Sequence, residues 1–345
     1  MDDFFGKKYK RFLIIPLILI VLFSFLIFIF PGVSPGIDLV GGNEITIRSK
    51  NQLNEQEIIS VLNEEFSLSE LSVSTLASPT SFGALIRYGN NPIINEVESL
   101  LANAEFNLDD DIISIEYSKK AIFLLNGLEK EYANAKLALL DAQDALLEYK
   151  EDFSASLQQA LENKLNLGEN FEFQKKEISP TIGAAALSSM LQISIWGFVL
   201  ITIIIFIAFR KFVPTAAIIL AMIFDVMAGL VGMALLNIPL TITTIPALLM
   251  LIGYSVDTDI MLTSRLLKNH GGTNGERATT SMKTGLTMTG TTLAALIPMI
   301  IISYFYQIEV VYNISAILLF GLIGDLISTW LMNAPILLWF IEGKK

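Results

Sequence analysis

Four aspartates interrupt long apolar stretches of this sequence: Asp225 in IFDVMAG, Asp257 and Asp259 in GYSVDTD, and Asp325 in GLIGDLIST. A carboxyl group in an apolar setting favours its neutral form and can take up and release a proton as water access changes. All four are therefore candidates for proton coupling, and Asp257 is the leading one. The alternative for each is a fixed hydrogen bond to a Ser or Thr side chain on a neighbouring helix.

Helical spacing relates these carboxylates to the residues around them. Arg265 follows Asp257 by eight residues, so on a helix the two share a face about two turns apart. Asp259 lies roughly 200° around the helix from Asp257, so the two carboxylates cannot both point at one neighbour. A Thr- and Gly-rich stretch around Gly290 could supply a polar path, and Gly253 and Gly290 are small enough to let helices approach closely.

The elements that must position these residues are six apolar runs long enough to cross a membrane. The first follows a basic segment, has no small-residue cleavage site and is predicted to be an uncleaved anchor. The third and fourth are joined by little more than Asn237-Ile238-Pro239, which predicts a tight turn. The last run is long enough to require tilt or an interfacial start near Tyr312. The six runs are 12–30, 188–209, 213–236, 241–262, 287–304 and 312–340.

Charge predicts the orientation. Residues 31–180 hold 25 acidic and 11 basic residues, whereas the rest of the chain holds 9 acidic and 12 basic residues. With six alternating spans, all 12 of these basic residues fall on one side, which the positive-inside rule assigns to the cytoplasm. We therefore expect cytoplasmic termini at 1–11 and 341–345, an extracytoplasmic domain at 31–187, and spans 2–6 within 188–340 of a cell-membrane protein.

The polar segment predicts an α+β domain. Gly41 and Gly42 form a turn before a strand at 43–49, and helices are expected at 54–66 and 92–104. The order strand, helix, strand, strand, helix, strand is the ferredoxin-like pattern. Residues 120–166 contain no Pro and repeat apolar residues at helical spacing, which predicts an inserted helical arm. Further strands are expected at 70–77, 82–88, 112–117 and 171–177, with a turn at Ser78–Ser81.

Several kinds of chemistry find little support. There is no cysteine, which excludes disulfides and thiolate catalysis. The single histidine, His270, lies in a Gly-rich loop and is interpreted as a solvated residue, not as a metal ligand. We expect no catalytic residue, metal site or cofactor, and no nucleic-acid partner.

Four stretches together resemble SecF, the smaller partner in the SecD/SecF family of RND-like protein-export membrane proteins. They are GIDLVGG, SPTIGAAAL, IGYSVDTDIMLTSRLLK and TGLTMTGTTLAALIP, and the DTD form is similar to that of the archaeal branch. The resemblance covers the whole chain in order. It implies a partnership with SecD, a place beside the Sec protein-conducting channel, contact with unfolded exported polypeptides, and use of the proton-motive force.

Two departures from bacterial SecF concern the site. There the helix 4 carboxylate follows an Asn and lies one position later, where this chain has Thr258, whereas Asp257 matches the acidic position of SecD. The Arg that begins helix 5 in bacterial SecF corresponds here to Thr284, with Lys283 adjacent. The resemblance therefore leaves the counter-ion of Asp257 open between Lys283, Arg265 and neither.

Three other functions compete with this hypothesis. An RND-type exporter of small molecules or lipids usually holds twelve spans in one chain, whereas this chain has six. An intramembrane aspartyl protease would need two carboxylates in reach of each other, which Asp225 and Asp257 could mimic, but its characteristic strings are absent. A passive scaffold of the Sec channel fits the same sequence without proton use.

Overall fold

The structure is a computed structural model of the 345-residue chain. It describes residue 5 and residues 9–30, 32–66, 68, 71–77, 82–89, 91–128, 130–165, 167, 171–178, 180–268 and 271–343. The predicted turn at Ser78–Ser81 and His270 lie outside these residues. The chain divides into two compact units, one formed by Met1–Val40 with Pro180–Lys345 and the other by Gly41–Ser179. The second unit is shorter than the predicted domain 31–187 at both ends, because the chain up to Val40 belongs to the first unit and the helix of the second apolar run already begins at Pro180.

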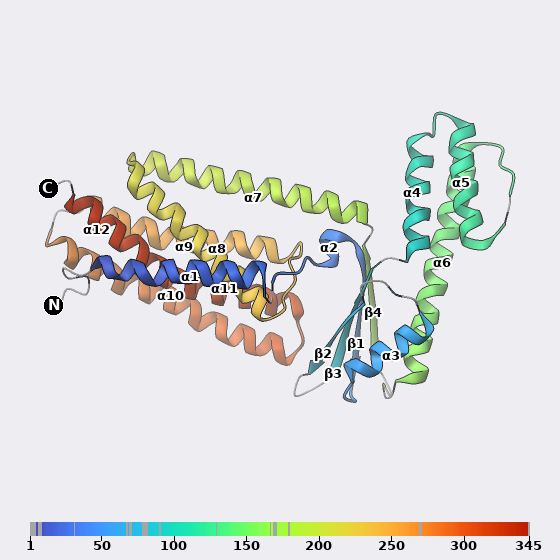
Figure 1. The fold of residues 1–345 in the computed structure, drawn as a ribbon, viewed down its shortest axis with the longest axis horizontal. Helices are drawn as coiled ribbons and strands as arrows, with labels where there is room; N and C mark the ends of the chain where they lie inside the picture. The colour runs from blue at the N-terminus through green and yellow to red at the C-terminus, as the bar shows by residue number, and fades with distance from the viewer. Residues whose placement is uncertain are drawn as a thin grey trace. The chain divides into compact units, whose positions relative to one another are not determined.

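The first unit is a helical bundle (Figure 1). Six of its helical stretches are long and apolar enough to cross a membrane, and they match the six predicted runs. Its elements are η1 (Tyr9–Leu13), α1 (Ile14–Phe28), α2 (Ile37–Val40), α7 (Pro180–Phe209), α8 (Phe212–Leu235), α9 (Thr244–Lys268), α10 (Asn274–Phe305), α11 (Glu309–Ile327), η2 (Ser328–Asn333) and α12 (Ala334–Glu342).

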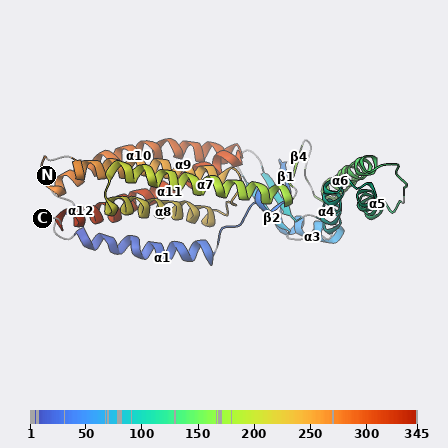
Figure 2. The same cartoon turned by 90° about the horizontal axis from the view of Figure 1, so that it is seen from above.

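The buried centre of this bundle consists of α8, α9 and α11, while most residues of α1, α7 and α10 remain exposed. Figure 2 shows α1 lying along α8 at one edge. Glycines allow the central helices to approach closely. A Cβ atom added at Gly321 would lie 2.2 Å from Leu251 Cδ2, and one at Gly324 would lie 2.4 Å from Ala228 Cβ.

The last apolar run is not one regular helix. Between α11 and α12 the six residues of η2 form a π-helical segment. Five of the six are buried, including Ser328, Thr329 and Asn333. A π-helical turn inside a longer helix frequently marks a functional site, because it changes which side chains share a face.

The second unit contains a four-stranded antiparallel sheet in the order β2-β3-β1-β4. The pairs Ile45↔Ile86 and Ile45↔Lys175 fix the register of the central strand β1 against its two neighbours. Gly41 and Gly42 precede and begin β1 with φ values of 83° and 129°, which favour glycine. Four of the predicted strands are present, as β1 (Gly42–Ser49), β2 (Ser72–Ala77), β3 (Phe82–Tyr88) and β4 (Glu172–Ile178).

The strand predicted at 112–117 is wrong, because these residues begin helix α5 (Asp111–Asn126). Asp110 caps this helix by accepting hydrogen bonds from the backbone N–H groups of Ile112 and Ile113. Ser114 donates to the Ala104 carbonyl oxygen at 2.8 Å, which ties α5 to the preceding helix. Capping and tertiary contact thus override the β-propensity of the isoleucines.

The other helices of this unit are α3 (Glu55–Glu65), α4 (Pro92–Phe106) and α6 (Ala135–Lys164). The C-terminal part of α6 packs with α3 on the sheet, where Leu157 and Leu161 join the core formed by the strands. Its N-terminal part packs against α4 and α5 through Leu139 and Leu146. Figure 1 shows α6 continuing from one group to the other. The predicted helical stretch at 120–166 is therefore part of α5 followed by α6.

Lys150 connects these two parts of the unit. Its ammonium group from the middle of α6 pairs with Glu98 of α4 at 2.7 Å and with Glu177 of β4 at 2.6 Å. Burial opposes the charge of Lys150, but the two carboxylates outweigh it and raise the pKa of Lys150. Burial also opposes the charge of Glu177, but Lys150 and Lys175 outweigh it and lower the pKa of Glu177.

Replacing Lys150 with Met should destabilise the second unit by about 1–2 kcal/mol at neutral pH, since it removes the Lys150 pair of Glu98 and leaves Glu177 with Lys175 alone. In the wild type the contribution of Glu177 is present above its ordinary pKa of 4.5 and is lost as the pH falls through its lowered pKa. The Met variant should therefore lose stability less steeply in acid. Hydrogen exchange of α4 and β4 amides in the full chain measures both effects.

Lys164→Met is the matched control, because Lys164 also lies on α6 and pairs with Glu64 and Glu65, but at an exposed position. Little change is expected for this variant. Equal protection of α4 and β4 in the two variants would contradict the connecting role of Lys150.

Candidate functional site: buried and exposed carboxylates

Three of the four predicted carboxylates meet inside the bundle. Asp225 of α8, Asp259 of α9 and Asp325 of α11 are each fully buried. We call these three residues the acid cluster. The helices that carry them are the central ones, and their close approach depends on the glycines described above.

Hydroxyl groups hold Asp225 on both sides. Ser255 donates to its Oδ2 atom from α9, and Ser328 donates to its Oδ1 atom from η2 at 2.6 Å. The Ser328 hydroxyl also lies 3.2 Å from the backbone carbonyl of Asp325.

Asp259 and Asp325 share a single hydroxyl. Thr329 Oγ1 lies 2.9 Å from Asp259 Oδ1 and 3.1 Å from Asp325 Oδ1. The Asn333 side-chain amide donates to Asp259 Oδ1 at 2.7 Å. A hydroxyl has one hydrogen to donate, so Thr329 cannot satisfy both carboxylates when both are ionised.

The acid cluster contains no cation among the described residues, because no Lys or Arg there pairs with any of its members. Uncompensated buried charges are costly, and three like charges in one apolar core would be more so. The arrangement therefore suits carboxyl groups that carry protons. No group of metal-binding residues is found in the part of the chain that the structure describes.

Asp257 is placed differently from the acid cluster. Its side chain is exposed on the outer face of α9, one turn after Gly253, which is also exposed. None of the described residues forms a hydrogen bond or an ion pair with it. As predicted, Asp257 and Asp259 point in different directions, and the pair of Asp225 and Asp257 required for a protease does not form.

The predicted counter-ions lie along α9 and α10 without reaching Asp257. Arg265 donates to Thr284 Oγ1 at 2.9 Å and to the Thr280 carbonyl at 3.4 Å. Lys283 is exposed. Within this chain, the described residues therefore provide no counter-ion for Asp257.

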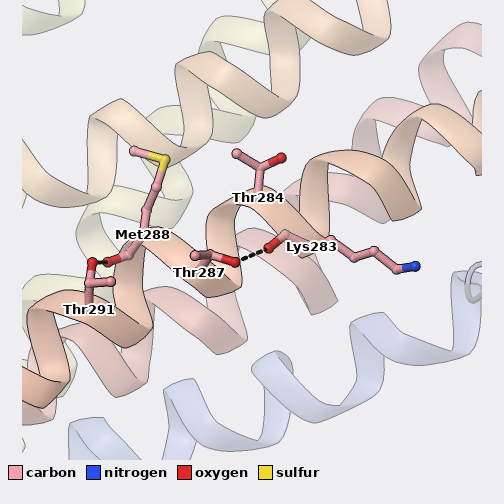
Figure 3. Close-up of a pocket in the computed structure, with 5 residues that line it drawn as sticks. All are labelled: Lys283, Thr284, Thr287, Met288 and Thr291. Atoms are coloured by element: carbon pink, nitrogen blue, oxygen red, sulfur yellow. Dashed lines mark hydrogen bonds between the residues drawn. The ribbon is translucent and has the colours of Figure 1, made fainter.

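A groove of about 440 Å³ lies on the exposed side of α10 (Figure 3). The Thr287 and Thr291 hydroxyls there donate to carbonyls of their own helix, at 2.9 and 2.8 Å. These two hydroxyls are therefore satisfied within α10. The groove is lined by Lys283, Thr284, Thr287, Met288 and Thr291.

Gly253, Gly290 and Thr258, which the sequence predicted to be part of the site, divide between the exposed surface and the buried interior of the bundle. A Cβ atom at Gly253 or Gly290 would meet no atom within 4 Å, so neither brings helices of this chain together. Gly285 does, since its Cβ would lie 2.4 Å from Trp330 Cζ2 and 3.2 Å from Thr258 Cγ2. Thr258 itself is buried against α10.

Sequence reasoning missed the residues that bond to the acid cluster. Ser328, Thr329 and Asn333 are polar residues in an otherwise apolar run, and Ser255 lies two residues before Asp257. Polar side chains within an apolar run were the one sequence signal that could have indicated them as partners of the carboxylates. Their convergence depends on the π-helical turn of η2, which the spacing does not indicate.

Six helical stretches long and apolar enough to cross a membrane, found among the described residues, define a multi-pass membrane protein. Residues 159–343 match the family described as Protein export membrane protein SecD/SecF, C-terminal. Over 342 residues the chain is 32% identical to the protein-export membrane protein SecF of Methanocaldococcus jannaschii, covering 98% of both chains. This chain belongs to the SecD/SecF family of protein-export membrane proteins.

The relative from Methanocaldococcus jannaschii is a SecF protein that is matched over nearly its full length. A second one, from Methanothermobacter thermautotrophicus, is 27% identical over 341 residues, which cover 98% of this chain and 95% of that one. The fold is similar to a crystal structure of SecDF, a translocon-associated membrane protein from a Thermus species, with a TM-score of 0.61 and 13% identity. That comparison covers 98% of this chain but only 59% of the SecDF chain.

Replacing Gly285 with Ala should destabilise the bundle by about 1–3 kcal/mol, because the new methyl group overlaps the buried Trp330 ring. Gly290→Ala is the control on the same helix, and it should be neutral or slightly stabilising because its site is open. Thermal unfolding in detergent, followed by tryptophan fluorescence, compares the two. Equal midpoints would show that Trp330 does not pack on Gly285.

Proposed function

We propose that this chain is a SecF-type accessory subunit that assembles with SecD beside the Sec channel and couples the proton-motive force to the movement of exported polypeptides. In this proposal it acts as a transport subunit and not as an enzyme. The observation that carries the proposal is the exposed, unpartnered Asp257 in the middle of a membrane-spanning helix.

An ionisable side chain facing lipid is expensive, so such groups usually face a protein partner or a water-filled cavity. Gly253 and Gly290 are open on the exposed sides of α9 and α10, which is what close packing of a further helix requires. This outer face, made of Gly253, Asp257, Thr287, Gly290 and Thr291, fits a second membrane subunit. The chain also spans 59% of the SecDF chain it resembles, which leaves room for a homologous second half.

In the proposed complex Asp257 is the residue that takes up and releases the proton. Two contacts between α9 and α10 support this role: Thr258, next to Asp257, faces Gly285, and Arg265 contacts Thr284, which lines the groove. The partner subunit then supplies the counter-ion that the described residues of this chain do not. Arg265, Lys283 and Thr284 lie along the path from Asp257 toward the basic ends of the helices.

The orientation in the proposal follows the charge. Both termini lie in the cytoplasm and the acidic unit lies outside the cell membrane, with lipids around the bundle. We infer that this unit is a ferredoxin-like domain in which α4, α5 and the first part of α6 are a helical insertion. Its exposed apolar side chains, including Phe106, Ile112 and Phe123, are suited to brief contact with unfolded exported chains.

Replacing Gly290 with Leu should weaken co-purification with SecD about tenfold or more, since the larger side chain occupies the proposed contact face. Gly197→Leu is the control, because Gly197 is equally open but lies on α7. The measurement is the fraction of SecD retained by tagged chain after detergent extraction. Equal retention by both variants would place the SecD contact elsewhere.

Replacing Asp257 with Asn should abolish the proton-gradient dependence of translocation in vesicles containing this chain, SecD and the Sec channel. The amide keeps the shape of the side chain but cannot carry a proton. Asp257→Glu is the control, since it retains the carboxyl group. If the Asn variant stimulates translocation as the wild type does and with the same gradient dependence, Asp257 is not the coupling residue, and a passive scaffold becomes the better description.

A further inference from the structure

The acid cluster has no part in the function proposed above. Several of its buried oxygen atoms lack a hydrogen-bond donor. Among the described residues, no hydrogen bond reaches Asp259 Oδ2, Asp325 Oδ2 or Asn333 Oδ1, and all three atoms are buried. The Ser255 and Thr289 hydroxyls lie near the Asp325 carboxyl, but Ser255 donates its hydrogen to Asp225. The amide oxygen of Asn333 is an acceptor, and so are the two carboxyl oxygens when they carry no proton. Leaving buried acceptors unsatisfied is costly, so the missing component is a set of donor hydrogens.

Among the described residues, no charged group of the surrounding elements pairs with the acid cluster. Lys10 and Arg11 of η1, which contacts η2, are exposed. α1 and α7 carry no ionisable residue, and Glu342 of α12 accepts a hydrogen bond from Tyr9 at 2.5 Å. On α9, Tyr254 and Asp257 are exposed, Arg265 bonds to α10, and Lys268 lies over the Phe209 ring. The remaining ionisable groups of α10 and α11 are exposed or lie in the first turn of their helix. They are Glu276, Arg277, Lys283 and Tyr304 of α10, and Glu309 and Tyr312 of α11.

We propose that Asp225, Asp259 and Asp325 form a proton-binding site contained wholly within this chain and separate from Asp257. The bound protons supply the hydrogens that the buried oxygens of Asp259, Asp325 and Asn333 otherwise lack. Ser255 and Ser328 orient the Asp225 carboxyl, and Thr329 joins the other two. This site stands whether or not Asp257 couples transport to the proton gradient.

The π-helical segment η2 is built around this site. Ser328 and Asn333 are five residues apart and both bond to the acid cluster. A π-helical turn brings residues at this spacing onto one face, whereas a regular α-helix would turn them roughly 140° apart. Because the η2 side chains donate these bonds, the site ties the acid cluster to the backbone register of η2 and of α12 that follows it.

Infrared spectroscopy of the full chain in phosphatidylcholine vesicles tests the proposal. All spectra use an Asp257→Asn background, so that the exposed carboxyl does not contribute. At about pH 7.5 ordinary Asp and Glu residues are ionised, and the carbonyl stretching band of protonated carboxyls should nevertheless be present. Adding Asp259→Asn or Asp325→Asn should reduce this band.

Three results would overturn the inference. The band is absent in the Asp257→Asn background, or it is unchanged by both further substitutions, or it appears only when sodium is replaced by choline, which would mean an alkali cation in place of protons. If a doubly substituted chain fails to fold, carboxyl-labelled [¹³C]aspartate keeps the test decisive. The label must shift the band of the folded Asp257→Asn protein, and labelled glutamate must leave it in place.

Discussion

The bundle depends on one constraint: a polar group within an apolar core must find its partner inside the protein. For the acid cluster, whose carboxylates lie on three helices, the partners among the described residues are donors from α9 and η2 and not a cation. Each of these contacts requires the helices to approach closely, and Gly321 and Gly324 make that approach possible. The glycines, the hydroxyls and the π-helical turn are therefore parts of one arrangement around the carboxylates.

The same constraint explains why Asp257 differs from Asp259. The two residues are separated by a single Thr on one helix, yet one is exposed and the other fully buried. On the inner face of α9 the Asp259 carboxyl has hydrogen-bond partners, whereas on the outer face the Asp257 carboxyl has none among the described residues. The two carboxyls of α9 thus lie in opposite environments, one bonded inside the bundle and the other without a described partner.

The features that depend on local sequence could be predicted. The six spans follow from apolar length alone, and β1, β2, β3 and β4 follow from alternation and turn residues. Residues 112–117 were mistaken for a strand because alternation cannot reveal the Asp110 cap or the bond from Ser114 to α4. Spacing also separated Asp257 from Asp259 correctly. It could not say which of them faced inward, because that depends on how α9 is rotated against α8 and α11.

The second unit adds a mechanical consequence. Helix α6 is 30 residues long, which corresponds to about 45 Å of continuous helix. One end is set in the core of the sheet and the other among α4 and α5, and Lys150 braces the middle against both. Such a helix is a stiff lever. A sideways force on α4 and α5 would be transmitted as torque to the edge strand β4, because α6 is one continuous helix between them.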